Sequence, residues 1–103
     1  MFGRKKIDVT MVTPEEGEEM FAFSIPYTKK KQTLKDISLI LSEVEGFRAF
    51  HFVEQKGILL FFDTLNHAKI GRNILSAECV PVSDKIVLFA VENGVPTGKG
   101  VAD

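Results

Sequence analysis

Three side chains in this sequence could act in catalysis or bind a metal, namely His51, His67 and Cys79. A cysteine activated by a histidine is a common nucleophile, but no signature of such an enzyme surrounds Cys79. The same residues could offer a metal at most three ligands, and the sequence has no Cys-x2-Cys or His-x3-His pair. We therefore predict no catalytic residue, no metal site and no cofactor, and we favour a non-enzymatic role with structural or surface histidines.

A run of lysines, Lys29, Lys30 and Lys31, precedes a predicted helix. Lysines beside the free amides of a helix start can hold a phosphate or another anion, although such runs are usually solvated loops. The whole chain carries 13 basic and 14 acidic residues, which argues against a dedicated nucleic-acid binder. Anion binding here, and nucleic-acid binding through this loop, stay as alternatives.

The length of 103 residues predicts one domain with a single core. One cysteine excludes an intramolecular disulfide and gives no sign of an oxidising compartment. The wholly apolar runs, such as residues 58–62, are far too short to span a bilayer. Polar Asp8 and Thr10 interrupt what would be the apolar part of a signal peptide. We therefore expect a cytoplasmic protein with no membrane partner.

Periodicity divides the chain into an N-terminal segment (1–19), a folded domain (20–92) and a flexible Gly-rich tail (93–103). In the tail, the Gly and polar residues outnumber the apolar ones. The expected elements are strands over 20–27, 47–53, 58–62 and 85–91, helices over 34–44 and 65–77, and an optional extra strand over 7–12.

The run Ile58-Leu59-Leu60-Phe61-Phe62 is the most informative element, because it is apolar on both faces. A strand of this kind must be covered on both sides, which places it inside a sheet. The helix that follows carries Ala68 and Gly71 on its inner face, and these small residues predict a close approach to the sheet.

The order strand-helix-strand-strand-helix-strand resembles the ferredoxin-like, split βαβ fold. The resemblance implies an α+β domain with a four-stranded antiparallel sheet and two helices on one face. Lys56-Gly57 and the small helix residues Ala68 and Gly71 are also similar to RNA-recognition-motif proteins. At the base-stacking positions of that family this chain has Ile58 and Leu60, so the similarity is one of fold and not of RNA chemistry.

With both helices on one face, the other face of the sheet would be bare and apolar. The area of this apolar patch would be larger than a monomer normally exposes. We expect it to bind a second copy of the chain or a protein partner, through Phe50, Phe52, Leu59, Phe61 and Phe89. Alternatively, residues 7–12 or the C-terminal tail cover this face within one chain, or a ligand does.

Tyr27 and His51 carry a further alternative that rests on the fold resemblance alone. Some ferredoxin-like dimers resemble small cofactor-independent oxygenases with an apolar pocket that holds one histidine or tyrosine. The resemblance implies that Tyr27 and His51 could line a ligand pocket between the helices and the sheet.

Overall fold

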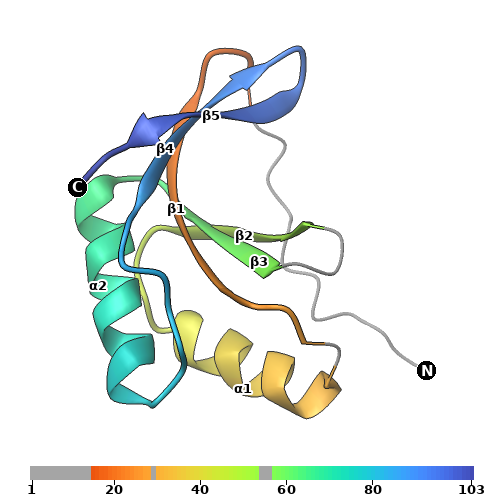
Figure 1. Cartoon of the computed structure of the whole chain (residues 1–103), viewed down its shortest axis with the longest axis vertical. Helices are drawn as coiled ribbons and strands as arrows, with labels where there is room; N and C mark the ends of the chain where they lie inside the picture. The colour runs from red at the N-terminus through yellow and green to blue at the C-terminus, as the bar shows by residue number, and fades with distance from the viewer. Residues whose placement is uncertain (1–14, 29, 54–56) are drawn as a thin grey trace.

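The computed structural model describes residues 15–28, 30–53 and 57–103, which form one antiparallel sheet and two helices (Figure 1). In chain order the elements are β1 (Glu19–Pro26), α1 (Lys31–Leu41), β2 (Phe47–Val53), β3 (Gly57–Phe62), α2 (Leu65–Ala77), β4 (Val87–Glu92) and β5 (Val95–Val101). The α+β class and the predicted order of the first six elements are confirmed. The expected four-stranded sheet is wrong, because a fifth strand follows. The optional strand over 7–12 lies outside the described residues.

The five strands lie in the order β2-β3-β1-β4-β5, and every neighbouring pair is antiparallel. β1 is the central strand: Phe21 lies opposite Phe62 of β3 on one side and opposite Leu88 of β4 on the other. β3 is an inner strand, as its uninterrupted apolar run predicts. β2 and β5 are the two outermost strands of the described sheet.

Helix α1 turns Leu34, Ile37 and Leu41 toward the core, as its apolar spacing predicts. The helix starts earlier than expected: the N-cap is Lys30, without a side-chain cap, and the expected cap Thr33 lies inside the first turn. The Thr28 hydroxyl accepts a hydrogen bond from the Lys30 amide at 3.1 Å, which shapes the entry to the helix.

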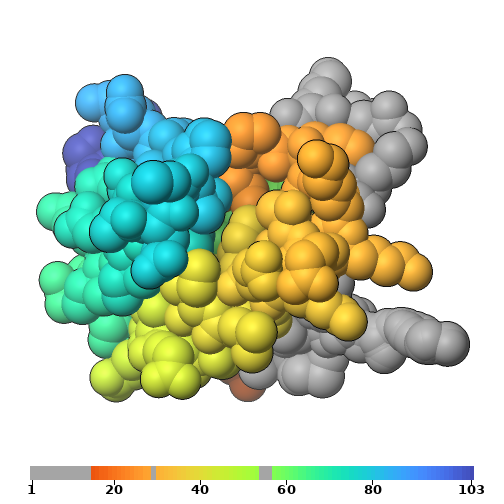
Figure 2. Space-filling model, turned by 90° about the horizontal axis from the view of Figure 1, so that it is seen from below, coloured from red at the N-terminus to blue at the C-terminus, as the bar shows by residue number. Residues whose placement is uncertain are grey.

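Helix α2 is capped by Thr64, whose hydroxyl accepts a hydrogen bond from the His67 amide at 3.1 Å. Ala68, Gly71 and Leu75 face the sheet and are buried. A Cβ at Gly71 would collide with the ring of Phe62, so the predicted close approach of this helix is confirmed. Figure 2 shows α1 and α2 side by side on the underside of the molecule.

Both faces of the sheet carry apolar side chains, but the helices cover only one. The main core lies between the sheet and both helices and contains Phe23, Ile58, Leu60 and Phe62. The opposite face carries a smaller group, here called the outer cluster. It consists of the buried residues Met20, Ala22, Phe61 and Val91, with Leu59 and Phe89 packed against them.

Residues 93–103 form strand β5 and its C-terminal anchor, and the expected flexible tail is not found. β5 pairs with β4 from Val95 opposite Glu92 to Val101 opposite Val87. Beyond the strand, the Ile86 amide donates to the Asp103 carboxylate at 2.9 Å, and Arg72 of α2 lies 3.1 Å from the same carboxylate. These long-range contacts fix a segment whose own composition favours disorder.

Candidate functional site

The last three residues of β2, His51, Phe52 and Val53, are all exposed and lie on an outermost strand of the sheet, and we call them the exposed end of β2. Phe52 keeps 46% of its surface exposed and Val53 keeps 37%. In the described part of the chain, β2 has a neighbouring strand only on its β3 side. The stretch from Ala49 to Val53 carries no Asp, Glu, Lys or Arg. Edge strands usually carry such charges to prevent pairing with other chains.

The three residues lie on the two faces of the strand. Phe52 faces the helix side, opposite Ile58 of β3, and its ring lies edge-on to Tyr27 with the ring centres 6.5 Å apart. His51 lies on the other face, opposite Leu59, with its ring 6.1 Å from that of Phe61. The exposed end of β2 therefore offers an aromatic surface on one face and a mixed surface on the other.

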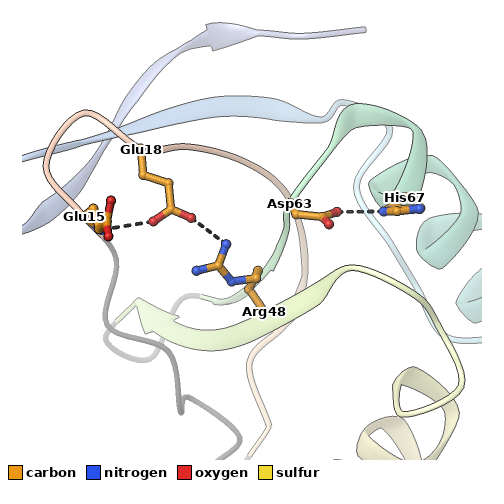
Figure 3. Close-up of polar contacts among 5 residues, drawn as sticks. All are labelled: Glu15, Glu18, Arg48, Asp63 and His67. Atoms are coloured by element: carbon orange, nitrogen blue, oxygen red, sulfur yellow. Dashed lines mark hydrogen bonds and ion pairs between the residues drawn. The ribbon is translucent and has the colours of Figure 1, made fainter.

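The charged residue of β2, Arg48, points back across the sheet. Its guanidinium lies 2.5 Å from the Glu18 carboxylate, just before β1, and the pair bridges across β3 (Figure 3). Glu18 also accepts a hydrogen bond from the Glu15 amide at 3.0 Å. That hydrogen bond, followed by Arg48, holds the pKa of Glu18 below its ordinary value of 4.5. The guanidinium is thus paired and directed away from the exposed end of β2.

The outermost strand on the other side, β5, has a different character. Its residues include Pro96, Gly98, Lys99 and Gly100, and its pairing with β4 shifts register between Leu88 and Phe89. Proline removes a donor, glycine weakens a strand and lysine resists burial, so each disfavours pairing with another chain. Lys99 is also ion-paired with Glu92 of β4. We call this side of the sheet the guarded edge.

The five residues predicted to form one interface do not share a face. Leu59, Phe61 and Phe89 lie on the outer face, but Phe50 belongs to the main core and Phe52 follows it on the helix side. The reason is a register shift between Phe47 and Ala49, a β-bulge that brings the rings of Phe47 and Phe50 to 5.3 Å on the same face. Strict alternation from Phe47 would have placed Phe50 on the opposite side.

The outer cluster is largely closed within one copy of the chain. Phe61 is 3% exposed, and Met20, Ala22 and Val91 are similarly buried. A ring buried to this degree offers no face on which a nucleic-acid base could stack. The centre of this face is therefore not a docking surface.

The remaining predicted residues are not brought together. Tyr27 lies against Phe52 and His51 lies against Phe61, on opposite faces, so the two do not line one pocket. Lys30 and Lys31 are exposed at the start of α1, and Lys29 lies outside the described residues.

The prediction from the sequence did not include one polar pair, Asp63 and His67. The His67 ring lies 2.7 Å from the Asp63 carboxylate, and this hydrogen bond raises the pKa of His67 (Figure 3). A Cβ at Gly46 would collide with both side chains, so this glycine with a φ of +87° fits against the pair. The four-residue spacing at a helix start was the available signal. Cys79 lies beyond the other end of α2, roughly 18 Å from His67 along the helix axis, so this thiol does not accompany the pair.

Among residues 15–28, 30–53 and 57–103, no group of three metal-ligating side chains occurs. Neither described helix is long and apolar enough to cross a membrane. Comparison with protein-family models, with curated proteins and with solved structures gave no match to this chain.

Proposed function

We propose that this chain is a small, non-enzymatic interaction module that binds an extended polypeptide segment beside the exposed end of β2. The observation that carries the proposal is the difference between the two outermost strands: β5 is guarded, whereas β2 ends in exposed, uncharged residues. Natural sheets rarely leave such an edge without a partner.

The chemistry of this edge favours a main-chain ligand. A strand added to a sheet edge gains affinity from backbone hydrogen bonds and specificity from alternate side chains, which contact the two faces. Here Phe52 with Tyr27 would receive an apolar or aromatic side chain on the helix side. On the other side, His51 and Val53 would receive the next residue of the ligand. The preferred segment is therefore extended, apolar at alternate positions and free of charge near its centre.

We interpret the fold as ferredoxin-like with one added strand. The order β2-β3-β1-β4, with a helix in each of the two crossovers, supports this interpretation, and β5 extends the sheet beyond β4. In this arrangement the two helices and the inner strands form the support, and the edge of β2 is the binding element.

The test is selection of short linear peptides from a phage-displayed library on the folded chain, with each binder mapped by NMR. We expect chemical-shift changes centred on residues 51–53 and a loss of affinity of about tenfold or more in Val53→Lys, because a buried lysine opposes strand addition. Val95→Lys on the guarded edge is the matched control and should bind as the parent does, since Val95 is also exposed. Peptides that map to the helices, or that bind Val53→Lys unchanged, would overturn the proposal.

A further inference from the structure

We propose that His67, Asp63 and Gly46 form a proton-dependent latch, which holds the turn between α1 and β2 against the start of α2 while the His67 ring carries a proton. Gly46 is the last residue before β2, Asp63 follows the end of β3, and His67 lies in the first turn of α2. The latch thus joins the chain just before β2 to the chain just after β3. It lies at the start of β2, whereas the proposed function concerns the exposed end of that strand, so the two do not depend on each other.

Asp63 connects the turn to the helix through two separate hydrogen bonds. Its amide donates to the Gly46 carbonyl at 2.9 Å, and its carboxylate lies 2.7 Å from Nδ1 of His67 (Figure 3). His67 is itself fixed at the helix start, because its amide donates to the Thr64 hydroxyl at 3.1 Å. A carboxylate accepts a stronger, charge-assisted hydrogen bond when the donating ring is protonated. The strength of the contact therefore depends on the charge of His67.

Gly46 packs directly on this hydrogen bond. A Cβ on this residue would collide with Oδ1 of Asp63 and with Nδ1 of His67, which are the two atoms that form the bond. A change in the separation of the two side chains must therefore displace the turn or leave a gap beside it. Through this packing, the protonation of one ring affects the chain at the beginning of β2.

The charges around His67 favour its protonated form. The hydrogen bond with Asp63 is the main reason that the pKa of His67 is raised, and partial burial of the ring opposes this rise. The negative charges of Asp63 and Glu45 raise the pKa of His67 further. The turn and the end of β3 therefore both present a carboxylate to the ring.

The cations of the adjacent elements act on other carboxylates, namely Arg48 on Glu18, and Lys69 and Arg72 on Asp103. Strand β3 carries no charged side chain, and α1 carries none after Asp36. The turn itself adds only the acidic residues Glu43 and Glu45. When His67 loses its proton, the carboxylates of Asp63 and Glu45 therefore lose the cation that balances them.

The latch closes at low pH and loosens as the pH rises. Because the pKa of His67 is raised in the folded chain, its proton stabilises the latch fully below the ordinary value of 6.5. This stabilisation is lost as the pH rises through the raised pKa of His67. Both side chains are partly exposed, so solvent can supply and remove the proton without unfolding of the chain. The neutral ring can still donate one hydrogen bond to Asp63, so we expect the turn to loosen and the fold to persist.

NMR measurements on the whole chain between about pH 5 and about pH 9 test the latch. The titration of the His67 ring and hydrogen exchange at the Asp63 amide are followed together, with exchange rates corrected for their intrinsic pH dependence. We expect the protection of this amide to fall by about threefold or more as His67 loses its proton. Protection that stays constant while His67 titrates would overturn the proposal.

Two variants assign the pH step to one ring. His67→Gln keeps a hydrogen-bonding side chain but cannot be protonated in this range, so it should remove the step. His51→Gln on β2 is the matched control and should retain the step, because His51 lies against Phe61 and away from the latch. A step that survives in His67→Gln would overturn the proposal, whatever the behaviour of the control.

The contribution of Asp63 is tested by Asp63→Asn. We expect the midpoint of the His67 titration to move to lower pH, because a neutral amide replaces the carboxylate that favours the protonated ring. Asp36→Asn on α1 is the control, since this carboxylate is exposed and is hydrogen-bonded to Gln32. An unchanged midpoint in Asp63→Asn would exclude the pair as the origin of the latch.

The latch and the proposed function fail separately. A chain that binds selected peptides at residues 51–53 but shows no pH step at the Asp63 amide would keep the proposed function and remove the latch. A pH step in a chain that selects no peptide at β2 would keep the latch and remove the proposed function.

Discussion

The two outermost strands of the sheet, β2 and β5, differ in what holds them and in what they expose. β5 consists mainly of residues that disfavour strands, and pairing with β4 and the anchor at Asp103 hold it in place. β2 is rich in aromatic residues, fixes its first half in the core and exposes its last three residues. The strand with the stronger intrinsic preference for pairing is thus the less protected one, and this difference is the basis of the proposal that β2 binds a partner segment.

The largest effect is expected inside β2 itself, between two neighbouring phenylalanines on the same face. Phe50 is 7% exposed and packs in the main core, so Phe50→Ala should lower the free energy of unfolding by about 3 kcal/mol or more. Phe52→Ala should lower it by less than about 1 kcal/mol, because this side chain is already half in water. Urea denaturation of both variants measures the difference, and equal losses would contradict the division of β2 into a core half and an exposed half.

The next effect comes from removing the protection of β5. The triple variant Pro96→Val, Gly98→Thr and Lys99→Thr restores a backbone donor, adds β-branched residues and deletes the charge. A Cβ at Gly98 would meet Phe89 at 3.7 Å, an ordinary contact, so the strand can accept the change. We expect light scattering to show a mass larger than that of the parent, because the edge of β5 would then be open to pairing with another chain. A variant with the parent's mass would show that these residues do not protect the edge.

A smaller effect is expected for the ion pair that directs Arg48 away from the exposed end of β2. Arg48→Met should cost about 0.5 kcal/mol at neutral pH, since both side chains are partly exposed. The pKa of Glu18 is lowered in the folded chain, so this carboxylate contributes stability above its ordinary pKa of 4.5 and loses it as the pH falls. The difference between parent and variant should therefore shrink below about pH 4. A difference that stays constant from neutral to acid pH would show that the pair does not contribute through charge.

The smallest effect is expected at the anchor of β5. Asp103→Asn keeps a hydrogen-bond acceptor for the Ile86 amide but removes the charge that faces Arg72. These contacts lower the pKa of Asp103, first through the Ile86 amide and then through Arg72. We expect faster amide exchange in β5 with no change in β2 or β3, because the loss is local. Faster exchange throughout the sheet would mean that the anchor supports the whole fold.

Much of this fold follows from short-range patterns in the sequence. The apolar run of residues 58–62 identifies an inner strand, and the spacing of Leu34, Ile37 and Leu41 identifies a helix face. Gly71 indicates the close approach of α2 to Phe62. Each of these signals depends on periodicity or residue size within one element. For this reason the order of six elements could be predicted.

The errors arise where distant contacts override local preference. A stretch with Pro96 and three glycines from 94 to 100 gives no strand signal, and only β4 and the Arg72–Asp103 pair make it one. Likewise, the sequence around Arg48 does not predict the β-bulge that places Phe50 on the helix side. The strand register therefore places the candidate surface at the edge of the sheet and not on its face.

The central position of β1 also governs how this chain reaches its folded state. β2 and β3 are separated by only three residues along the chain and can associate soon after the chain collapses. β1, however, must wait for partners far along the chain, since Phe21 pairs with Phe62 and with Leu88. Closing such long loops carries an entropic barrier, so we expect β1 insertion to limit the rate of folding. Until then the inner side of β3 is unprotected, and newly made chains are most vulnerable to misassembly in that interval.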